Sequence, residues 1–555
     1  MCVMETINSV LWGAPMMALL LLAGGFFTAG TGAFQLRHWL HCLRSTVFSR
    51  SRKNSGEGAV TPFQAMASSL AATLGTGNIA GVAAALTAGG AGAVFWMWVT
   101  ALLGTMTGYA ENVLGGYYRR KNGGAWCGGA MYYIRYGLAE MRGVRHIAKP
   151  LAAVFAGACV LASLGMGNIV QINSAALALH SGFGVPAWAA GLALTACAGA
   201  VIFGGMKRTA KVSEKLVPLM SGLYIIGSLM IIGADLTRIP QALGAVISGA
   251  FGLEQAAAGV SGYMVKQAVC MGIRRGVFSN EAGLGSSPAA HASSDEAEPC
   301  VLGMWSIVEV AFNTLVMCSM TAFVLLCCPC GAPTMDEVFS SVTERPQYFR
   351  LTDEPGLITR GAELIKSGGG ELLTFRTAEG GEFTAGIEYC GATCSNVMKV
   401  TGISDGGGIT GVLLEEVSGS ELVTLAFSGV FGNAAGKMIC VAVVLFAFTT
   451  VTGWSCFGGA AAEYLFGSRA RLPYLIVFTA VSAAGGLLDM SSAWGAADLF
   501  NGVMAAVNLP AVLLLSGKVF RLTRSYKARK FGGSREKPML SAYPDIQSQL
   551  ERRRE

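Results

Sequence analysis

Long apolar runs alternate with short polar, basic segments along most of the chain. Each run holds roughly 20 residues, the number that an α-helix needs to cross about 30 Å of hydrocarbon. The pattern predicts an all-α polytopic membrane protein with eleven transmembrane helices. The expected spans are residues 10–33, 66–88, 93–115, 150–174, 183–204, 216–233, 258–291, 302–328, 436–466, 471–489 and 497–517.

One of these runs is interrupted. Residues 73–98 read TLGTGNIAGVAAALTAGGAGAVFWMW, with glycines and an asparagine at 75–78 where a plain membrane helix carries leucine. Backbone N–H and C=O groups find no water in a bilayer, so a break is tolerable where the freed groups face a cavity or a ligand. Broken helices of this kind mark transporter binding sites. The alternative is that Gly75 and Gly77 only let neighbouring helices pack closely.

A second interruption lies in the run 258–291. If the N-terminal span is an accessory helix, ten core spans remain, and the interrupted ones are the first and the sixth. Matching breaks in two five-helix halves predict an inverted repeat with a binding site between the halves, near the middle of the membrane. The second break lies either at Gly272 or within residues 280–285, and the sequence leaves both open.

The charge of the loops predicts the orientation. Residues 37–53 carry five basic side chains, whereas residues 1–12 carry only one charged residue, an acid. Because basic loops stay in the cytoplasm, we expect the N-terminus outside and the C-terminus in the cytoplasm. The basic loops 118–149 and 207–215 agree, but the loop 292–298 is acidic and does not fit.

Changes in composition divide the chain into five parts. These are an accessory N-terminal transmembrane helix (1–36), core helices 1–7 (60–328), an extracytoplasmic insert (329–420), core helices 8–10 (421–520) and a partly disordered cytoplasmic tail (521–555). Alternating residues near 372–376 and 411–414 predict that the insert is small and β-rich. Cys330, Cys390 and Cys394 lie in it, and either a disulfide or free thiols in a poorly ordered loop are compatible with the sequence.

Composition excludes several classes of protein. The chain has 555 residues, of which 53% are hydrophobic and 13% charged, and it contains 75 glycines, which is too apolar for a soluble globular protein. The net charge of +7 implies no nucleic acid, because the basic residues gather in the loops between spans. No nucleophile and base stand at a recognisable catalytic spacing, so we expect no enzyme.

Six motifs occur in order over nearly all of the membrane part. They are GTGNIAGVAAALTAGGAGAVFWMW (75–98), ENVLGGYYR (111–119), GNIVQINS (167–174), KRTAKVSEKLVP (207–218), RGVFSNEAGLGSSPAAHAS (275–293) and LFAFTTVTGWS (445–455). Together they resemble the alanine/glycine:cation (sodium:alanine) symporter family, a sodium-coupled branch of the leucine-transporter fold. The resemblance does not extend to the insert or the tail.

The resemblance implies a site for a small neutral amino acid. The N–H groups of Thr76 and Gly77 would hold its carboxylate, and Asn78 would supply an oxygen to the substrate or to a cation. Asn168 and Gln171 share a helical face and could bind substrate or, equally, join helices. The candidate substrate residues are Thr76, Gly77, Asn78, Asn168, Gln171, Gly272, Phe278 and Trp454.

The same resemblance implies a sodium site beside it. Carbonyls of Ala71 and Leu74 and the hydroxyls of Thr449 and Thr450 would bind the ion, although a threonine can also bond only its own helix. Trp454 lies one turn after Thr450 and would wall the pocket against large side chains.

One departure from the family bears on the coupling ion. The family commonly carries an acid in the seventh core span, where this chain reads Phe312-Asn313-Thr314. Asn313 is a candidate ligand for a second cation, and the missing acid leaves sodium or proton coupling open. His291 is expected at the cytoplasmic face in contact with solvent.

The sequence therefore predicts sodium-coupled import of alanine or glycine across the cell membrane by alternating access. The expected partners are the amino acid, sodium and the lipid bilayer, with no organic cofactor. A sensor that binds amino acids without transporting them, and a proton-coupled symporter, are the alternatives.

Overall fold

The computed structural model describes residues 3–46, 61–122, 125–252, 261–327, 347–350, 372–376, 382–386, 397–404, 409–416, 419–486 and 490–552. The first half contains α1 (Val3–Leu11), α2 (Ala14–Thr31), α3 (Phe34–Arg37), α4 (Trp39–Thr46), α5 (Pro62–Thr73), η1 (Thr76–Asn78), α6 (Ala80–Gly89), α7 (Gly92–Tyr117), β1 (Arg120–Asn122), β2 (Ala125–Cys127), α8 (Ala130–Tyr132), η2 (Tyr133–Gly137), α9 (Arg145–Leu164), η3 (Gly165–Ile169), α10 (Val170–Phe183), α11 (Ala187–Ile202), α12 (Gly205–Ala234) and α13 (Arg238–Phe251). The second half contains α14 (Ser261–Asn280), α15 (Pro288–His291), α16 (Pro299–Val310), η5 (Ala311–Cys318), α17 (Ser319–Cys327), strands β3 (Gln347–Arg350), β4 (Leu372–Arg376), β5 (Glu382–Gly386), β6 (Val397–Ser404) and β7 (Ile409–Glu416), then α19 (Gly419–Phe431), α20 (Asn433–Phe466), η6 (Ser468–Ala470), α21 (Arg471–Gly485), α22 (Met490–Leu514), α23 (Ser516–Phe531) and α24 (Pro544–Arg552).

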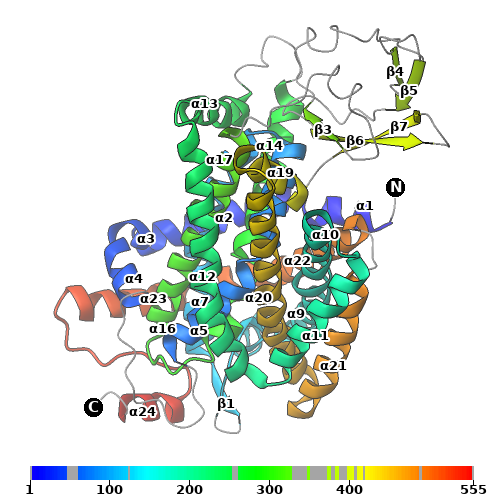
Figure 1. The fold of residues 1–555 in the computed structure, drawn as a ribbon. Coiled ribbons are helices and arrows are strands. Elements are labelled where there is room, and N and C mark those ends of the chain that lie inside the picture. Colours follow the sequence, from blue (N-terminus) through cyan, green and yellow to red (C-terminus); the bar gives the residue numbers. More distant parts are fainter. Residues whose placement is uncertain are drawn as a thin grey trace.

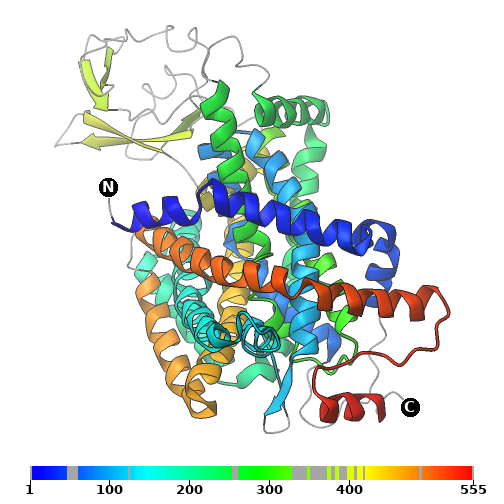
Figure 2. The same ribbon diagram turned by 180° about the vertical axis from the view of Figure 1, so that it is seen from behind.

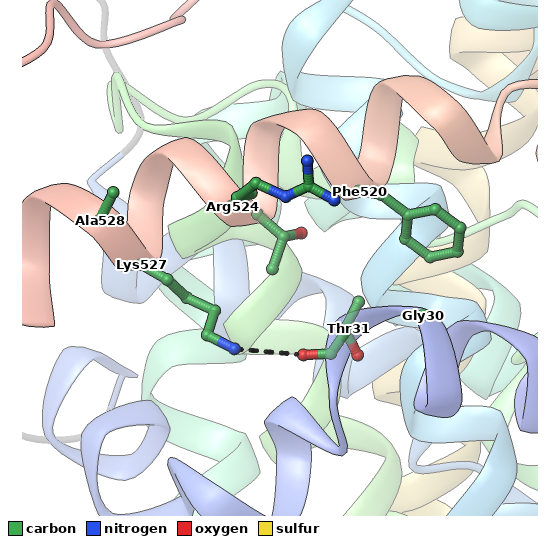
Figure 3. A pocket seen from close by; sticks show the side chains of 7 residues that line it. Gly30, Thr31, Phe520, Arg524, Lys527 and Ala528 are labelled. Carbon is green, nitrogen blue, oxygen red and sulfur yellow. Dashed lines mark hydrogen bonds between the residues drawn. The ribbon is translucent and has the colours of Figure 1, made fainter. Parts of the chain in front are cut away.

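The helices form one bundle between two different ends (Figure 1). Helices α7, α12 and α20 run between an end that carries strands β3–β7 and an end that carries the hairpin β1–β2 and helix α24. Figure 2 shows the N-terminal helices beside α22 and α23. The two segments run in the same direction, because Asn8 bonds the carbonyl of Gly495 and, further along, Lys527 bonds the carbonyl of Thr31 (Figure 3).

Fewer helices than expected satisfy a strict test for crossing a membrane. Among the described residues, seven helices are long and apolar enough, or eight if one bent pair counts as one span. The expected number of eleven is therefore not reached by this measure. Three of the expected spans fall short for physical reasons: α11 and α21 have 16 and 15 residues, and α14 carries three basic side chains. The inverted repeat stays a prediction.

The first expected break is present, and its causes are visible. Helix α5 begins with a capping box between Thr61 and Gln64. It ends at Thr73, and η1 and α6 continue at an angle of 58°. Gly75 is extended between them, and a Cβ atom there would lie 2.7 Å from the hydroxyl of Thr450 and 3.0 Å from Oε1 of Gln171. Only glycine fits this close approach.

The second break follows Asn280, and helix α14 runs unbroken through Gly272. Residues Glu281, Gly283 and Gly285 all have positive φ values of 58°, 96° and 73°. Two glycines adopt this conformation without strain, whereas Glu281 does so at a cost. The break that the sequence left open is thus at 281–287, and a break at Gly272 is wrong. A Cβ atom at Gly272 would lie 2.4 Å from the carbonyl oxygen of Ala93, so this glycine serves helix packing.

The insert contains strands where the alternation predicted them. Strands β3, β6 and β7 form one antiparallel sheet, and β4 and β5 form a hairpin. The cysteines Cys330, Cys390 and Cys394 lie outside the described residues.

The C-terminal segment is more ordered than the sequence suggested. Helix α23 continues to Phe531, ten residues past the expected start of a tail, and α24 packs against the hairpin β1–β2 through Trp126, Ile546 and Leu550. The acidic loop 292–298, which did not fit the rule that cytoplasmic loops are basic, contacts this C-terminal segment. Glu298 forms an ion pair of 3.1 Å with Arg529, so part of its charge is neutralised within the fold.

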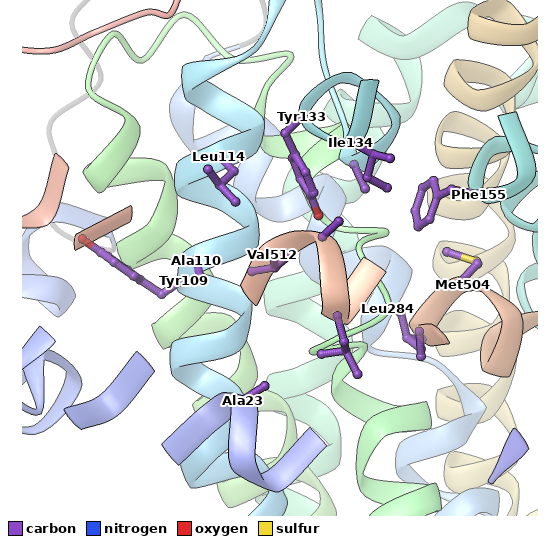
Figure 4. Packing of buried hydrophobic residues seen from close by; sticks show 14 of the residues in the cluster. Ala23, Tyr109, Ala110, Leu114, Tyr133, Ile134, Phe155, Leu284, Met504 and Val512 are labelled. Carbon is purple, nitrogen blue, oxygen red and sulfur yellow. The ribbon is translucent and has the colours of Figure 1, made fainter. Parts of the chain in front are cut away.

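A large apolar cluster joins the N-terminal and C-terminal helices to the core. Figure 4 shows Ala23 of α2, Ala110 of α7, Phe155 of α9 and Met504 of α22 in this cluster, together with Leu284 from the second break. Small residues such as Ala23 and Ala110 let the helix axes approach closely. The second break is therefore held by tight packing on the side of α22.

Helix α20 offers a test of how tightly the first broken span is held. A Cβ atom at Gly453 would lie 2.7–2.9 Å from Cβ, Cα and N of Ala72 in α5, whereas one at Gly459 would lie 3.7 Å from its nearest neighbour, Tyr474. We expect Gly453→Ala to lower the free energy of unfolding by about 1–3 kcal/mol, because α5 and α20 must separate. Gly459→Ala is the matched control and should be neutral. Thermal unfolding of the purified protein measures both, and equal stability of the two variants would contradict this packing.

Candidate functional site

Side chains from α14, η5 and α17 meet around Asn78, the last residue of η1. Asn78 Nδ2 donates to Oδ1 of Asn313 at 2.5 Å, and Ser279 Oγ donates to Oδ1 of Asn78. Asn313 Nδ2 in turn donates to the carbonyl of Ser279 at 2.6 Å and to that of Thr73 at 3.3 Å. The backbone carbonyl of Asn78 accepts from Thr321 at 2.7 Å. Side chains thus bond the carbonyls of Thr73, Asn78 and Ser279 next to the two breaks.

Two of the candidate residues lie in helices of unusual geometry. Asn313 lies in η5, a π-helical stretch of eight residues, and Asn168 lies in a second one, η3. Short π-helical turns within α-helices are frequent at functional sites, because they aim side chains away from the regular helix face. Heptad or 3.6-residue spacing could not have predicted where these side chains point.

A second group of contacts lies on the other side of η1. The backbone N–H and the hydroxyl of Thr76 both donate to Oε1 of Gln171, at 3.0 and 2.9 Å. Thr450 Oγ1 donates to the carbonyl of Ala71 at 3.1 Å. Oxygen atoms from α5, α10 and α20 therefore gather within one turn of the break at Gly75.

The aromatic candidates bound this centre. Phe278 lies against η1, because a Cβ atom at Gly77 would be 3.0 Å from its ring. Trp454 is fully buried and donates its indole N–H to Oε1 of Glu281 at 3.0 Å. A Cβ atom at Gly167 would lie 2.3 Å from Trp454, so this ring fills the space between η3 and the second break.

Not every predicted residue joins the group. Thr449 donates to the carbonyl of Phe446 in its own helix at 3.0 Å and contacts the sulfur of Met220, so the structure does not bring it to Ala71. Asn168 donates to the carbonyl of Phe478 at 2.7 Å and accepts from Ser482, which makes it a link between helices. Gly272 lies against α7, as described above.

The remaining candidate residues lie around the first break, at the end of α5 and beside η1. Ala71 is in the last turn of α5, and Leu74 caps its C-terminal end. The C-terminal end of a helix carries a partial negative charge that favours a cation. Thr76, Gly77, Asn78, Gln171, Phe278, Thr450 and Asn313 all make the contacts around η1 given above.

One series of buried, hydrogen-bonded polar side chains was not predicted from the sequence. His291 was expected in solvent, but its side chain is fully buried, and that expectation is wrong. Its Nε2 lies 3.1 Å from Oε2 of Glu309, and its Nδ1 lies 2.7 Å from Oδ1 of Asn112. Asn112 Nδ2 already donates to Gly108 and Ser287, so its oxygen faces the imidazole and Nδ1 carries a proton. The other side of Glu309 accepts from Ser69 at 2.7 Å and from Thr73 at 3.2 Å, both in α5.

His291 and Glu309 therefore form a buried pair, with Nε2 and Oε2 3.1 Å apart. A signal for it existed in the sequence, because Glu309 is an acid within the apolar run 302–328, and such residues are costly there and default to function. Ser279 gave no such signal, since a serine in a membrane helix is unremarkable by composition.

The fold and the site define a class. This is a multi-pass membrane protein with a broken helix whose bare backbone groups meet buried polar side chains at the centre of the bundle, as in secondary transporters. The sodium:alanine symporter family model matches residues 1–345 and 385–540. The chain belongs to that family.

Individual relatives agree. The chain is 34% identical to a sodium/alanine symporter of Methanococcus maripaludis, covering 94% of this chain and 96% of that protein. It is 31% identical to a probable sodium/glutamine symporter of Bacillus subtilis, covering 95% and 90%. It is 29% identical to a putative sodium/proton-dependent alanine carrier protein of the same organism, covering 95% and 93%. A manganese transporter structure from Eremococcus coleocola covers 90% of this chain and is covered over 86% of its own, at 13% identity, with a TM-score of 0.42, too low to establish a shared fold.

Asn313→Asp tests whether this position can serve a cation. A carboxylate there would face the carbonyl oxygens of Ser279 and Thr73, which now accept from the amide. We expect the free energy of unfolding to fall by about 3 kcal/mol in sodium-free buffer, because one oxygen of the buried carboxylate would face two carbonyl oxygens with no donor between them. Sodium should restore more stability to this variant than to the wild type.

The control is Asn280→Asp, where the neighbouring hydroxyl of Thr314 can turn to donate to the new carboxylate. Thermal unfolding with and without sodium chloride, against potassium chloride at equal ionic strength, measures both variants. An equal sodium effect in the wild type and in Asn313→Asp would remove Asn313 from the cation-binding residues.

Proposed function

We propose that the protein imports a small neutral amino acid, alanine or glycine, together with sodium by alternating access. The observation that supports this most is the break at Gly75, where the C-terminal end of α5 and the N–H groups of η1 are one or two residues apart. The first suits a cation and the second a carboxylate. A zwitterion and an ion can bind side by side there.

The ion would bind on the α5 side of the break. The carbonyl of Ala71 and the hydroxyl oxygen of Thr450 are 3.1 Å apart, and carbonyl and hydroxyl oxygens are the ligands that small hard cations prefer. Leu74 adds a carbonyl at the end of the same helix. The bond from Thr450 to Ala71 supports Thr450 in this role, whereas Thr449 bonds its own helix.

The substrate would bind on the η1 side. Gln171 now presents an amide oxygen to the N–H and hydroxyl of Thr76, and a carboxylate could replace that oxygen as the acceptor. Phe278 lies over Gly77, and Trp454 fills the space beside η3, so bulky rings bound the centre on two sides. Such walls favour a small side chain.

Sodium binding and substrate binding would be coupled because both ligands contact the same broken helix. An ion that fixes the end of α5 and a substrate that fixes η1 both favour the same arrangement of the two segments around Gly75. Each ligand then raises the affinity of the other, and by linkage the two effects are equal.

A second candidate function is proton-coupled import by the same fold, and the His291–Glu309 pair favours it. Glu309 accepts from Ser69 and Thr73 in the last two turns of α5, so a proton on the pair acts on the helix that would hold the ion. Loss of that proton would leave a negative charge buried without a partner beyond these hydroxyls, which is costly in a membrane.

The threonine pair tests the sodium site. Uptake of labelled alanine or glycine into proteoliposomes should rise with an inward sodium gradient. We expect Thr450→Val to raise the sodium concentration for half-maximal uptake by roughly tenfold, because the ion loses one oxygen ligand. Thr449→Val removes the adjacent hydroxyl, which bonds its own helix, and should leave sodium activation near the wild-type value. Equal effects of the two variants, or uptake that ignores the gradient, would defeat the sodium assignment.

Glu309→Gln tests the proton candidate. The amide keeps an acceptor for Ser69 and Thr73 and a donor toward His291, but it cannot gain or lose the shared proton. In sodium-free buffer with an acidic exterior, we expect wild-type uptake to exceed that of the variant severalfold, with no difference when sodium drives uptake. Uptake in the wild type that does not respond to an imposed proton gradient would exclude proton coupling and leave the sodium proposal untouched.

A further inference from the structure

A pocket of about 250 Å³ lies between the end of α2 and the middle of α23, away from the candidate site (Figure 3). It is lined by Gly30, Thr31, Phe520, Thr523, Arg524, Lys527 and Ala528. Gly30 is required for its shape, because a Cβ atom there would lie 2.2 Å from the ring of Phe520. We call it the α2–α23 pocket.

Positive charge borders this pocket. Figure 3 shows Arg524 and Lys527 on the same stretch of α23, and none of the lining residues is acidic. Arg37 adds a third cation, because its guanidinium and the ammonium of Lys527 would each lie 3.8 Å from a Cβ atom at Gly32. Among the described residues, Arg524 and Lys527 form no ion pair, although Arg529 and Lys518 on the same helix are paired with Glu298 and Glu140.

A neighbouring histidine reports the same excess of positive charge. Burial lowers the pKa of His38, and the charges of Lys527 and Arg37 lower it further. His38 stacks on Phe531 at the end of α23, with ring centroids 4.3 Å apart. An imidazole whose pKa is lowered stays neutral at neutral pH, so His38 adds no charge to the cluster. Its lowered pKa reflects the positive charge of Lys527 and Arg37 nearby.

Apolar surface leads away from these cations. The segment Thr6–Thr31 and the segment Trp494–Leu514 are both apolar enough to span a membrane. The pocket is lined by the last residues of the first segment and by residues that follow the second. Leu22 and Phe26 of α2 are 70% and 47% exposed, and Leu514 of α22 is 47% exposed. Phe26 also packs on Phe520, with centroids 5.5 Å apart. The ligand that fits is therefore amphipathic, with an anionic head.

We propose that the α2–α23 pocket binds the phosphate headgroup of an anionic phospholipid. Arg524 and Lys527 contact the phosphate, and an acyl chain lies along Phe26 and Leu514. Basic pockets between membrane helices recognise anionic lipids in this way, since the phosphate gains charge-assisted hydrogen bonds while the chain stays in hydrocarbon. The lipid thereby joins α2 to α23.

The experiment compares lipids on the purified, delipidated full-length chain by native mass spectrometry. Phosphatidylglycerol should be retained over phosphatidylcholine of the same chain length. Loss of either cation should weaken phosphatidylglycerol binding about fivefold, and Arg524→Gln with Lys527→Gln together about thirtyfold. Arg145→Gln removes one exposed charge at the start of α9 and should leave binding unchanged.

Three outcomes would overturn the assignment. Equal retention of the two lipids would show no preference for the anionic headgroup. A loss in Arg145→Gln as large as in the double variant would reduce the effect to net charge. Inorganic phosphate that displaces phosphatidylglycerol at millimolar concentration and protects the protein from thermal unfolding equally well would make this a site for free anions. Arg524 and Lys527 are both at least partly exposed, so the variants should fold. Thermal unfolding in phosphatidylcholine nanodiscs verifies this.

Discussion

Every backbone polar group inside a membrane needs a partner, and the structure around Gly75 depends on how this chain supplies those partners. A continuous helix would satisfy them alone. Here the helix ends at Thr73, and Gln171, Thr450, Asn313 and Thr321 bring side-chain groups from four other elements to the freed N–H and C=O groups. The break therefore persists only because distant segments converge on it.

That constraint explains why small residues surround the break. Gly75, Gly77, Gly167 and Gly453 each lie where a Cβ atom would meet a neighbour within 3.0 Å or less. The polar groups reach η1 because the helices that carry them lie unusually close to it. The hydrogen bonds to the freed backbone groups therefore depend on close packing of the helices. A larger residue at any of these positions would move the helices apart and separate a donor from its acceptor.

The sequence predicted what depends on local composition. Glycines and an asparagine within an apolar run were enough to place the first break, and alternation placed β4 and β7. It could not decide between Gly272 and Asn280 for the second break, because glycine serves close packing and chain reversal equally well. The direction of the Asn168 side chain depends on how a π-helical turn is oriented. Which of Thr449 and Thr450 faces α5 depends on the rotation of a long helix. The spacing of residues in the sequence determines neither. The His291–Glu309 pair joins residues 18 apart across a chain reversal, so its existence depended on tertiary structure.

The distribution of charge bears on the coupling ion. Asn313, in η5, is neutral and bonds two carbonyl oxygens. Three buried carboxyl groups stand near the breaks. Glu281 accepts from the indole of Trp454, Glu111 accepts from Asn508, which also bonds the carbonyl of Gly283, and Glu309 of α16 accepts from Ser69 of α5. Of these, Glu309 has a titratable partner within 3.1 Å and contacts the helix that ends at the first break. A cation bound at the end of α5, as proposed above, would change the electrostatic field at Glu309, because Ser69 and Thr73 of that helix bond its carboxyl group. In the proposed function, sodium binding and the buried His291–Glu309 pair would then be linked through one half-helix, so the position of α5 would affect both.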